Sequence, residues 1–163
     1  MWIGQGVVFY DVETTGLDRS AQIVSIGAVT QNGETFHIYI VPTCNINRRA
    51  SEVHGIYKQN GHLFKDGILI RNALDPHSGL SCFMGWLESQ SCKILVKIPI
   101  NIYFLKSSSL KKIFQVAHNN FGFDGKVLKS NMDQFGVRRP VDCCTHLVDS
   151  LLIMRRNLIP FNF

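Results

Sequence analysis

The chain has 163 residues and carries 17 Lys and Arg against 12 Asp and Glu, which gives a formal net charge of +5. This length fits one domain with a core of its own. We find no apolar stretch that could span a membrane and no basic-then-apolar amino-terminal signal. The five cysteines include no Cys-x-x-Cys pair, which favours reduced thiols over disulfides or zinc. These features predict a single intracellular domain, nuclear or cytoplasmic, with no membrane partner.

The hydrophobic pattern predicts a mixture of strands and helices. We expect strands, in chain order, at residues 6–11, 22–30, 34–41 and 93–96. The hairpin signal Gln31-Asn32-Gly33 joins the second strand to the third, so the first three strands form an antiparallel meander. We expect helices at residues 48–55, 78–89 and 124–135, and a further helix at the end of 142–156. The chain is therefore expected to be an α/β domain.

The most informative segment is the first strand, which ends in two acids. Asp11 and Glu13 are two residues apart, so alternation along a strand places both carboxylates on one face. Neighbouring carboxylates repel each other unless cations lie between them, and hard divalent ions prefer oxygen ligands. A Thr-Thr-Gly-Leu turn follows at once, and Gly16 would let the backbone approach a bound molecule closely. An isolated Asp-x-Glu is usually a solvated strand end, so the rest of the chain must decide.

Three later segments extend this pattern. They are Ala50-Ser51-Glu52-Val53-His54-Gly55-Ile56, then Val116-Ala117-His118-Asn119-Asn120-Phe121-Gly122-Phe123-Asp124, and finally Val148-Asp149-Ser150-Leu151. Together with the paired acids they resemble, in order, the motifs of the DnaQ-like, or DEDD, 3′–5′ exonucleases. The four matches cover most of the chain. Among subgroups, the animal three-prime repair exonucleases and related exonuclease-like domains are the most similar.

The resemblance implies an RNase H-like fold. Its mixed central sheet would contain the antiparallel meander and further parallel strands, and helices would flank this sheet. It also implies a two-metal site for Mg²⁺ or Mn²⁺, which serves phosphodiester hydrolysis. Asp11 would bridge both ions, Glu13 would bind the ion that activates water, and Asp124 would hold the second ion. These three are the expected catalytic and metal-binding residues. The substrate would be the 3′ end of single-stranded DNA or RNA.

The resemblance further implies a set of residues around the terminal nucleotides. They are Thr14, Thr15, Gly16, Leu17, His54, Ile56 and Asn119. Leu17 would lie against the last base, Ile56 would stack on or wedge against a base, and His54 would touch sugar or phosphate. Plainer alternatives are an ordinary turn at Thr14, a structural histidine, and an asparagine that fixes its own loop through backbone hydrogen bonds.

The chain departs from the family pattern at its carboxyl end. The family has a His or Tyr general base followed four or five residues later by a fourth acid, several tens of residues beyond the position of Asp124. Here 39 residues follow Asp124, and they contain no His-x-x-x-x-Asp. Loss of a general base alone costs roughly 10²–10⁴-fold in rate. We therefore expect a domain that is truncated at its carboxyl terminus and is weak or inactive as an enzyme.

Residues 96–115 interrupt the expected order of elements. This segment contains four of the lysines and no acid, so it accounts for most of the positive charge. Without it, Lys93-Ile94-Leu95 would run directly into Val116-Ala117 as one strand. We interpret the segment as an insertion, either a retained intron or a lineage-specific one, within one domain that spans residues 1–163. The alternative is an ordinary strand and basic loop that extend the sheet.

Two other functions fit parts of the sequence. A catalytically dead relative of the exonuclease fold, which binds nucleic-acid ends or a protein, would keep the paired acids and lack the last motif. A haloacid-dehalogenase-like phosphatase also begins with a strand and paired acids, but it needs a second Asp where this chain has Glu13. It also lacks the His-Gly-Ile and Ala-His-Asn segments, so we reject it.

Overall fold

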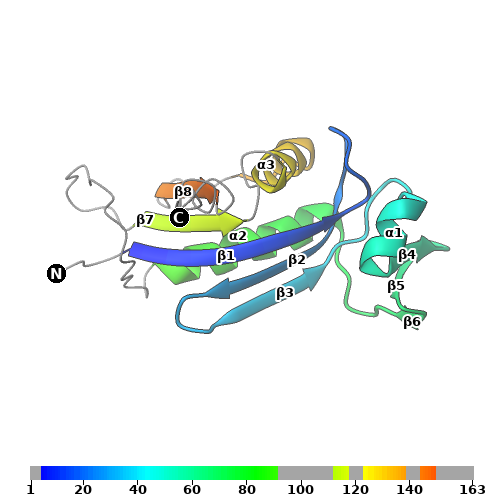
Figure 1. The fold of residues 1–163 in the computed structure, drawn as a ribbon, viewed down its shortest axis with the longest axis horizontal. Helices are drawn as coiled ribbons and strands as arrows, with labels where there is room; N and C mark the ends of the chain where they lie inside the picture. Colours follow the sequence, from blue (N-terminus) through cyan, green and yellow to red (C-terminus); the bar gives the residue numbers. More distant parts are fainter. Residues whose placement is uncertain (1–4, 92–111, 118–122, 139–143, 150–163) are drawn as a thin grey trace, which may run out of the picture.

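The computed structural model describes residues 5–91, 112–117, 123–138 and 144–149. Within them, a five-stranded sheet has the strand order β3-β2-β1-β7-β8 (Figure 1). Its strands are β1 Gln5–Thr14, β2 Ile23–Thr30, β3 Thr35–Tyr39, β7 Lys112–Ala117 and β8 Cys144–Asp149. The first three pair antiparallel, whereas β7 runs parallel to both β1 and β8. The predicted mixed sheet with an antiparallel meander is confirmed.

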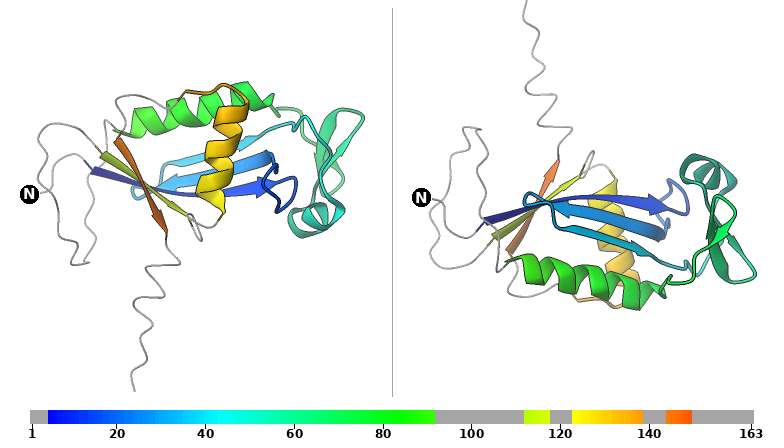
Figure 2. Two further views of the ribbon diagram at one scale, coloured as in Figure 1. Left: turned by 90° about the horizontal axis from the view of Figure 1, so that it is seen from above. Right: turned by 90° about the horizontal axis from the view of Figure 1, so that it is seen from below.

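Three helices and a second, smaller sheet complete the described fold. The helices are α1 Arg48–His54, α2 Pro76–Ser91 and α3 Asp124–Gln134. The smaller sheet, here called the accessory sheet, consists of β4 Ile56–Gln59, β5 His62–Lys65 and β6 Ile68–Leu69. Figure 2 shows α1 and the accessory sheet beyond the end of the large sheet at which β1 stops. The connection after β3 therefore brings its side chains to the end of β1 that carries the acids.

The predicted helices at 48–55, 78–89 and 124–135 are confirmed to within two residues at each end. β8 and the whole accessory sheet were not predicted from the sequence. Two strong turn signals in this region were overlooked. They are Asn60-Gly61 and Asp66-Gly67, and every one of these residues has a positive φ, as in tight two-residue hairpin turns. The predicted strand at 93–96 and the end of the segment 142–156 lie outside the described residues.

The predicted insertion at 96–115 overlaps the described structure only at its end. Residues 112–115 form most of β7, and they pair with β1 from Gln5 to Val8. For these four residues the structure fits the alternative interpretation, in which an ordinary strand extends the sheet. Residues 96–111 lie outside the described ranges, so the insertion itself stays a prediction.

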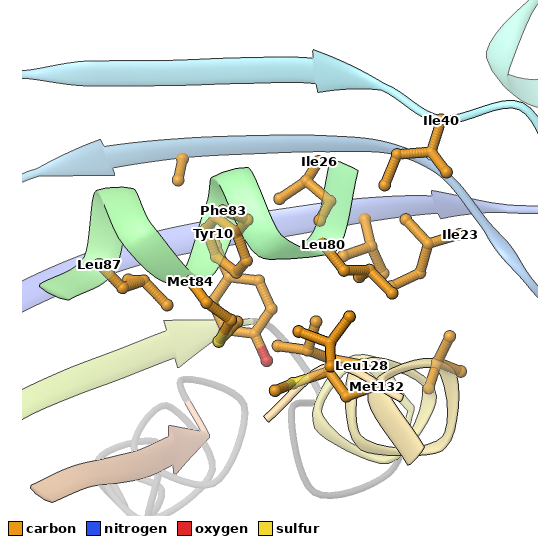
Figure 3. Packing of buried hydrophobic residues seen from close by; sticks show 14 of the residues in the cluster. Tyr10, Ile23, Ile26, Ile40, Leu80, Phe83, Met84, Leu87, Leu128 and Met132 are labelled. Atoms are coloured by element: carbon orange, nitrogen blue, oxygen red, sulfur yellow. The ribbon is translucent and has the colours of Figure 1, made fainter. Parts of the chain in front are cut away.

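Alternation along β1 separates the core from the opposite face of the sheet. Val8, Tyr10 and Val12 are buried against α2 and α3, in one cluster with residues such as Phe83 and Leu128 (Figure 3). The aromatic ring of Tyr10 lies 6.1 Å from that of Phe83, centroid to centroid. The intervening positions of β1 point the other way, as the pleat dictates. One of them, Phe9, is 47% exposed and is paired in register with Val29, which is 37% exposed.

Asn131 ties α3 to the first residues of β2. Its side chain is 1% exposed and makes three hydrogen bonds. The amide oxygen accepts from the Ile23 N–H at 3.0 Å, and the amide nitrogen donates to the carbonyls of Ala21 at 2.9 Å and Val127 at 3.0 Å. Every polar atom of this buried amide is therefore satisfied, and the helix that begins at Asp124 is held against the meander.

We predict that two glycines of α2 respond in opposite ways to alanine. A Cβ at Gly79 would lie 2.6 Å from Ile40 Cγ1, so Gly79→Ala forces the helix away from β3 and lowers the free energy of unfolding by about 1–3 kcal/mol. Gly85 is exposed, and a Cβ added there would meet nothing within 4 Å. Gly85→Ala therefore raises the free energy of unfolding by about 0.5–1 kcal/mol. Urea unfolding of both variants tests this packing. Equal effects of the two substitutions would contradict it.

Candidate active site

The paired acids lie within β1, which continues to Thr14. The Asp11 side chain is exposed and that of Glu13 is half-buried, on the face of the sheet opposite the core. Their register partners on β2 are the small residues Gly27 and Ser25. Burial raises the pKa of Glu13, and the negative charge of Asp11 raises it further. The negative charge of Asp11 thus disfavours the ionised form of Glu13, and a bound cation would relieve such a repulsion.

The turn after the acids is held by its own hydrogen bonds. The Thr14 hydroxyl donates to the Gly16 carbonyl at 2.7 Å, and the Thr15 hydroxyl accepts from the Gln22 N–H at 2.9 Å. Both threonines are 6% exposed. The Thr15 carbonyl also accepts from the Asn47 N–H at 2.8 Å, which attaches the start of α1 to the turn. In this arrangement both hydroxyls serve the turn, and their contact with a nucleotide stays a prediction.

His54 fastens α1 and the accessory sheet to the acidic end of β1. Its Nδ1 lies 3.1 Å from the backbone nitrogen of Ile56, which has a hydrogen to donate. Nδ1 must therefore accept, so Nε2 carries the proton and donates to the Thr14 carbonyl at 3.1 Å. Both ring nitrogens are used in the neutral form. The structure thus gives His54 a positioning role, whereas its predicted contact with sugar or phosphate remains a prediction.

The other residues predicted to contact nucleotides have different environments. Leu17 is 86% exposed, so an apolar side chain stands in solvent four residues after Glu13. A Cβ at Gly16 would make only ordinary contacts, the nearest at 3.5 Å, so the protein's own packing does not demand glycine there. Ile56 is 1% exposed and packs with Val24 in a second core cluster, so its side chain does not face a substrate in this structure. Asn119 lies outside the described residues.

Asp124 is not grouped with the other two acids. It is the first residue of α3 and is 7% exposed, and its negative charge, together with burial, raises the pKa of Tyr10 above its usual range. Tyr10 points to the core side of β1, away from the face that carries Asp11 and Glu13. Among the described residues, no three His, Cys, Asp or Glu side chains lie close enough together to hold a metal. The three-acid site therefore stays a prediction.

Lys65 is a charged neighbour of the acids that the sequence analysis missed. It is the last residue of β5 and is paired with Ile56, two residues after His54. Next to it, the Asp66 N–H donates to the Gly55 carbonyl at 3.0 Å, which attaches the accessory sheet to the end of α1. A protonated His54 would lower the pKa of Glu13, and the positive charge of Lys65 lowers it less strongly, so both oppose part of the effect of burial. The hairpin signal at Asp66-Gly67 was the clue that could have located it.

The structure thus combines a central mixed α/β sheet with paired acids near the end of its first strand and a hydrogen-bonded turn directly after them. The sequence matches the model of the RNase T exonuclease family over residues 8–139, which is most of the chain. The chain therefore belongs to this DnaQ-like exonuclease family, and its RNase H-like fold is the one the sequence predicted. No helix formed by the described residues is long and apolar enough to cross a membrane.

Two curated relatives are DNA polymerase III proteins. The epsilon subunit of Rickettsia conorii is 33% identical over 105 residues, which cover 60% of this chain and 41% of that protein. The PolC-type DNA polymerase III of Thermotoga petrophila is 36% identical over 87 residues, which cover 50% of this chain and 6% of that protein. The chain thus spans less than half the length of these relatives.

Similar solved structures include two exonuclease I proteins. That of Methylocaldum szegediense has a TM-score of 0.66 at 16% identity, covering 97% of this chain and 31% of its own. E. coli exonuclease I in complex with a dT13 oligonucleotide has a TM-score of 0.65 at 14% identity, covering 93% of this chain and 29% of its own. At these identities the likeness supports the fold alone.

We predict that Glu13→Gln stabilises the chain at neutral pH. Because the pKa of Glu13 is raised in the folded state, the wild-type loses stability as the pH rises through that pKa. The neutral amide removes this loss, so the variant melts at a higher temperature at pH 7 and matches the wild-type below about pH 4. Thermal unfolding by circular dichroism between pH 3 and pH 8 measures the difference, with the exposed Glu34→Gln as control. A melting difference that is independent of pH would contradict the assignment.

We predict that Lys65→Met raises the pKa of Glu13 further, because it removes a positive charge that favours the carboxylate. Lys58→Met is the matched control. It removes the same charge from the adjacent strand, where the ammonium donates to the Pro42 carbonyl. NMR titration of the Glu13 side-chain carbonyl carbon reads the pKa directly. If the two variants titrate alike, Lys65 does not act on Glu13.

Proposed function

We propose that this chain is a divalent-metal-dependent 3′–5′ exonuclease domain that acts on the 3′ end of single-stranded DNA and is a weak enzyme by itself. The observation that carries the proposal is the Asp11–Glu13 pair, held beside the turn of residues 14–17 at the end of β1. Membership of the exonuclease family supports hydrolysis of phosphodiesters. The DNA polymerase III relatives, and exonuclease I in its complex with dT13, favour DNA over RNA as the substrate.

The donor set on β1 fits a hard divalent cation in part. Asp11 and Glu13 offer carboxylate oxygens on one face, and their mutual repulsion favours a bound Mg²⁺ or Mn²⁺. Two carboxylates alone leave most of such an ion's six positions to water or substrate. When bound, the metal would lower the pKa of a water molecule and offset negative charge on the phosphate. E. coli exonuclease I, a protein of similar fold, forms a zinc-bound complex with single-stranded DNA, and this supports a divalent ion in the chain described here.

The residues around the acids would then place the substrate. Leu17, exposed at the tip of the turn, offers an apolar contact for the terminal base. His54 would act on the substrate indirectly, because its hydrogen bond holds the Thr14 carbonyl and with it the direction in which the turn leaves β1. Lys65 would bring a positive charge toward a phosphate that lies against Glu13. Each of these contacts orients the strand without taking part in proton transfer.

The low activity that we propose would follow from a missing group. No histidine followed five residues later by an acid occurs among the residues after Asp124. Without a side chain placed to accept a proton from water, the rate falls roughly 10²–10⁴-fold. We propose that the 163-residue chain hydrolyses DNA slowly for this reason.

A second candidate function is binding of nucleic-acid ends without hydrolysis. The position of Asp124 favours it, because this acid lies on the side of Tyr10 and is not grouped with Asp11 and Glu13 within the described part of the chain. Under this alternative the paired acids would hold a cation that neutralises the terminal phosphate only.

The experiment is a Mn²⁺-supported nuclease assay with single-stranded DNA and RNA labelled at either end. We expect slow release of mononucleotides from the 3′ end of DNA, and a loss of at least tenfold in the Asp11→Ala/Glu13→Ala variant. Glu34→Ala, which changes an exposed acid in the β2–β3 turn, is the matched control and keeps full activity.

Binding of 3′ ends without cleavage would favour the second candidate. Equal activity in the wild-type and the double variant would remove Asp11 and Glu13 from the mechanism. Cleavage of RNA alone would overturn the choice of substrate.

A further inference from the structure

The accessory sheet has two faces of different character. Ile56 and Leu63 point to one face, are at most 1% exposed, and pack with Val24 of the large sheet. Alternation along the strands puts a different set on the other face, called here the outer face. It consists of Tyr57, Gln59, His62, Phe64 and Leu69. Tyr57 and Phe64 are half-buried and the other three are exposed.

A row of apolar side chains crosses the outer face from strand to strand. Tyr57 pairs in register with Phe64, and Phe64 pairs with Leu69. The two aromatic rings stack with their centroids 5.3 Å apart and an angle of 8° between their planes. Two-residue turns at Asn60-Gly61 and Asp66-Gly67 hold the three strands in this register. The row is therefore a preformed surface of stacked rings.

A cavity of about 270 Å³ lies at the end of this row. Its walls are mainly apolar and include Val41 and Ile70, whereas His62 and Arg71 bring polar groups to it. Leu69 belongs both to the row and to the lining of the cavity, so the two features are continuous. No acid occurs on the outer face or among the residues that line the cavity, and the exposed Arg71 gives this surface a positive charge.

We propose that the outer face and its cavity bind an unpaired segment of single-stranded DNA, several nucleotides from the end held at Asp11 and Glu13. Proteins that bind single strands without sequence preference combine aromatic rings, on which bases stack, with cationic side chains that bind phosphates. A base would enter the cavity, and the exposed Arg71 in its lining would bind a phosphate beside that base. A small-molecule site would need several converging polar groups, whereas His62 and Arg71 suit a repeated phosphate.

The position of the accessory sheet supports this occupant. β4 begins two residues after His54, which bonds to the Thr14 carbonyl, so the sheet is attached directly to the turn of the candidate active site. Gly55 also has a close neighbour in the sheet, because a Cβ there would lie 2.2 Å from Asp66 Oδ1. Figure 1 shows the accessory sheet (β4, β5 and β6) beyond the end of the large sheet, next to α1. A DNA strand with its 3′ end at the turn would therefore reach the accessory sheet if it continued in that direction. The inference rests on the proposed function for the choice of DNA.

The test measures the dissociation constants of two labelled oligo-dT probes for the full chain in EDTA, by fluorescence anisotropy. One probe has about 3 nucleotides and the other about 12, which brackets the length that a surface of this size covers. Phe64→Leu keeps an apolar side chain and removes the ring stack, and Arg71→Gln removes an exposed charge. We expect each to weaken binding of the long probe about tenfold, and to leave the short probe unchanged.

Lys129→Gln is the matched control for charge, because it removes one cation from α3, where Lys129 pairs with Asp133. It should change neither constant by more than about twofold. Phe64→Trp should restore binding, since it returns a ring to the row. Because Arg71 is exposed, Arg71→Gln tests the proposal even if Phe64→Leu fails to fold.

Equal binding of the long probe by the wild-type, Phe64→Leu and Arg71→Gln would overturn the inference and leave the proposed function standing. A wild-type that binds neither probe would overturn the inference, whereas the proposed function, which needs the metal that EDTA removes, is tested by the nuclease assay. If Phe64→Leu instead abolishes self-association of the wild-type in sedimentation, the outer face binds a second copy and the inference is wrong. The same variants are also measured with an oligo-U probe of about 12 nucleotides. If they weaken binding of oligo-U and leave binding of oligo-dT unchanged, the outer face binds RNA and the assignment to DNA is wrong.

Discussion

The division of β1 into two faces is the constraint on which the rest of this domain depends. Tyr10 and the even-numbered residues Val8 and Val12 are buried under α2 and α3. Because side chains alternate along a strand, Asp11 and Glu13 point to the opposite face. A shift of one residue in register would bury both carboxylates and expose the core residues, at a cost far above the stability of a small domain. The core therefore fixes the direction of the acids, and their repulsion is a consequence of stable folding.

A second layer of organisation comes from a few hydrogen bonds between distant segments. His54 joins the accessory sheet to the carbonyl of Thr14, 40 residues earlier, and Asn131 joins α3 to Ile23, 108 residues earlier. Both use side-chain atoms to satisfy backbone groups, which gives them direction as well as strength. His54 thus holds the turn after the acids, and Asn131 holds the start of β2. A site that must place a phosphate within a fraction of an ångström needs this support.

Much of the fold could be predicted because its signals are local. The meander, the helix at 48–55 and the helix ended by Gly136 all follow from alternation, turn chemistry and capping within a few residues. The accessory sheet was missed although its two turns carry equally local signals, because its strands are short and include exposed residues such as Ile68, at 74% exposed. Strand β8 was missed because only a helix at the end of residues 142–156 was predicted, and nothing was assigned to the residues before it.

By itself, the sequence determined the family, the strand that carries the acids, and the face that Asp11 and Glu13 share, since each of these follows from residue order and the period of a strand. Only the tertiary structure decided that His54 bonds to the backbone with both ring nitrogens, that Ile56 is buried, and that Asp124 acts on Tyr10. It also brought Lys65 to Glu13. These relations depend on how the chain closes between distant residues, and no spacing in a sequence encodes the distance between two atoms that packing alone brings together.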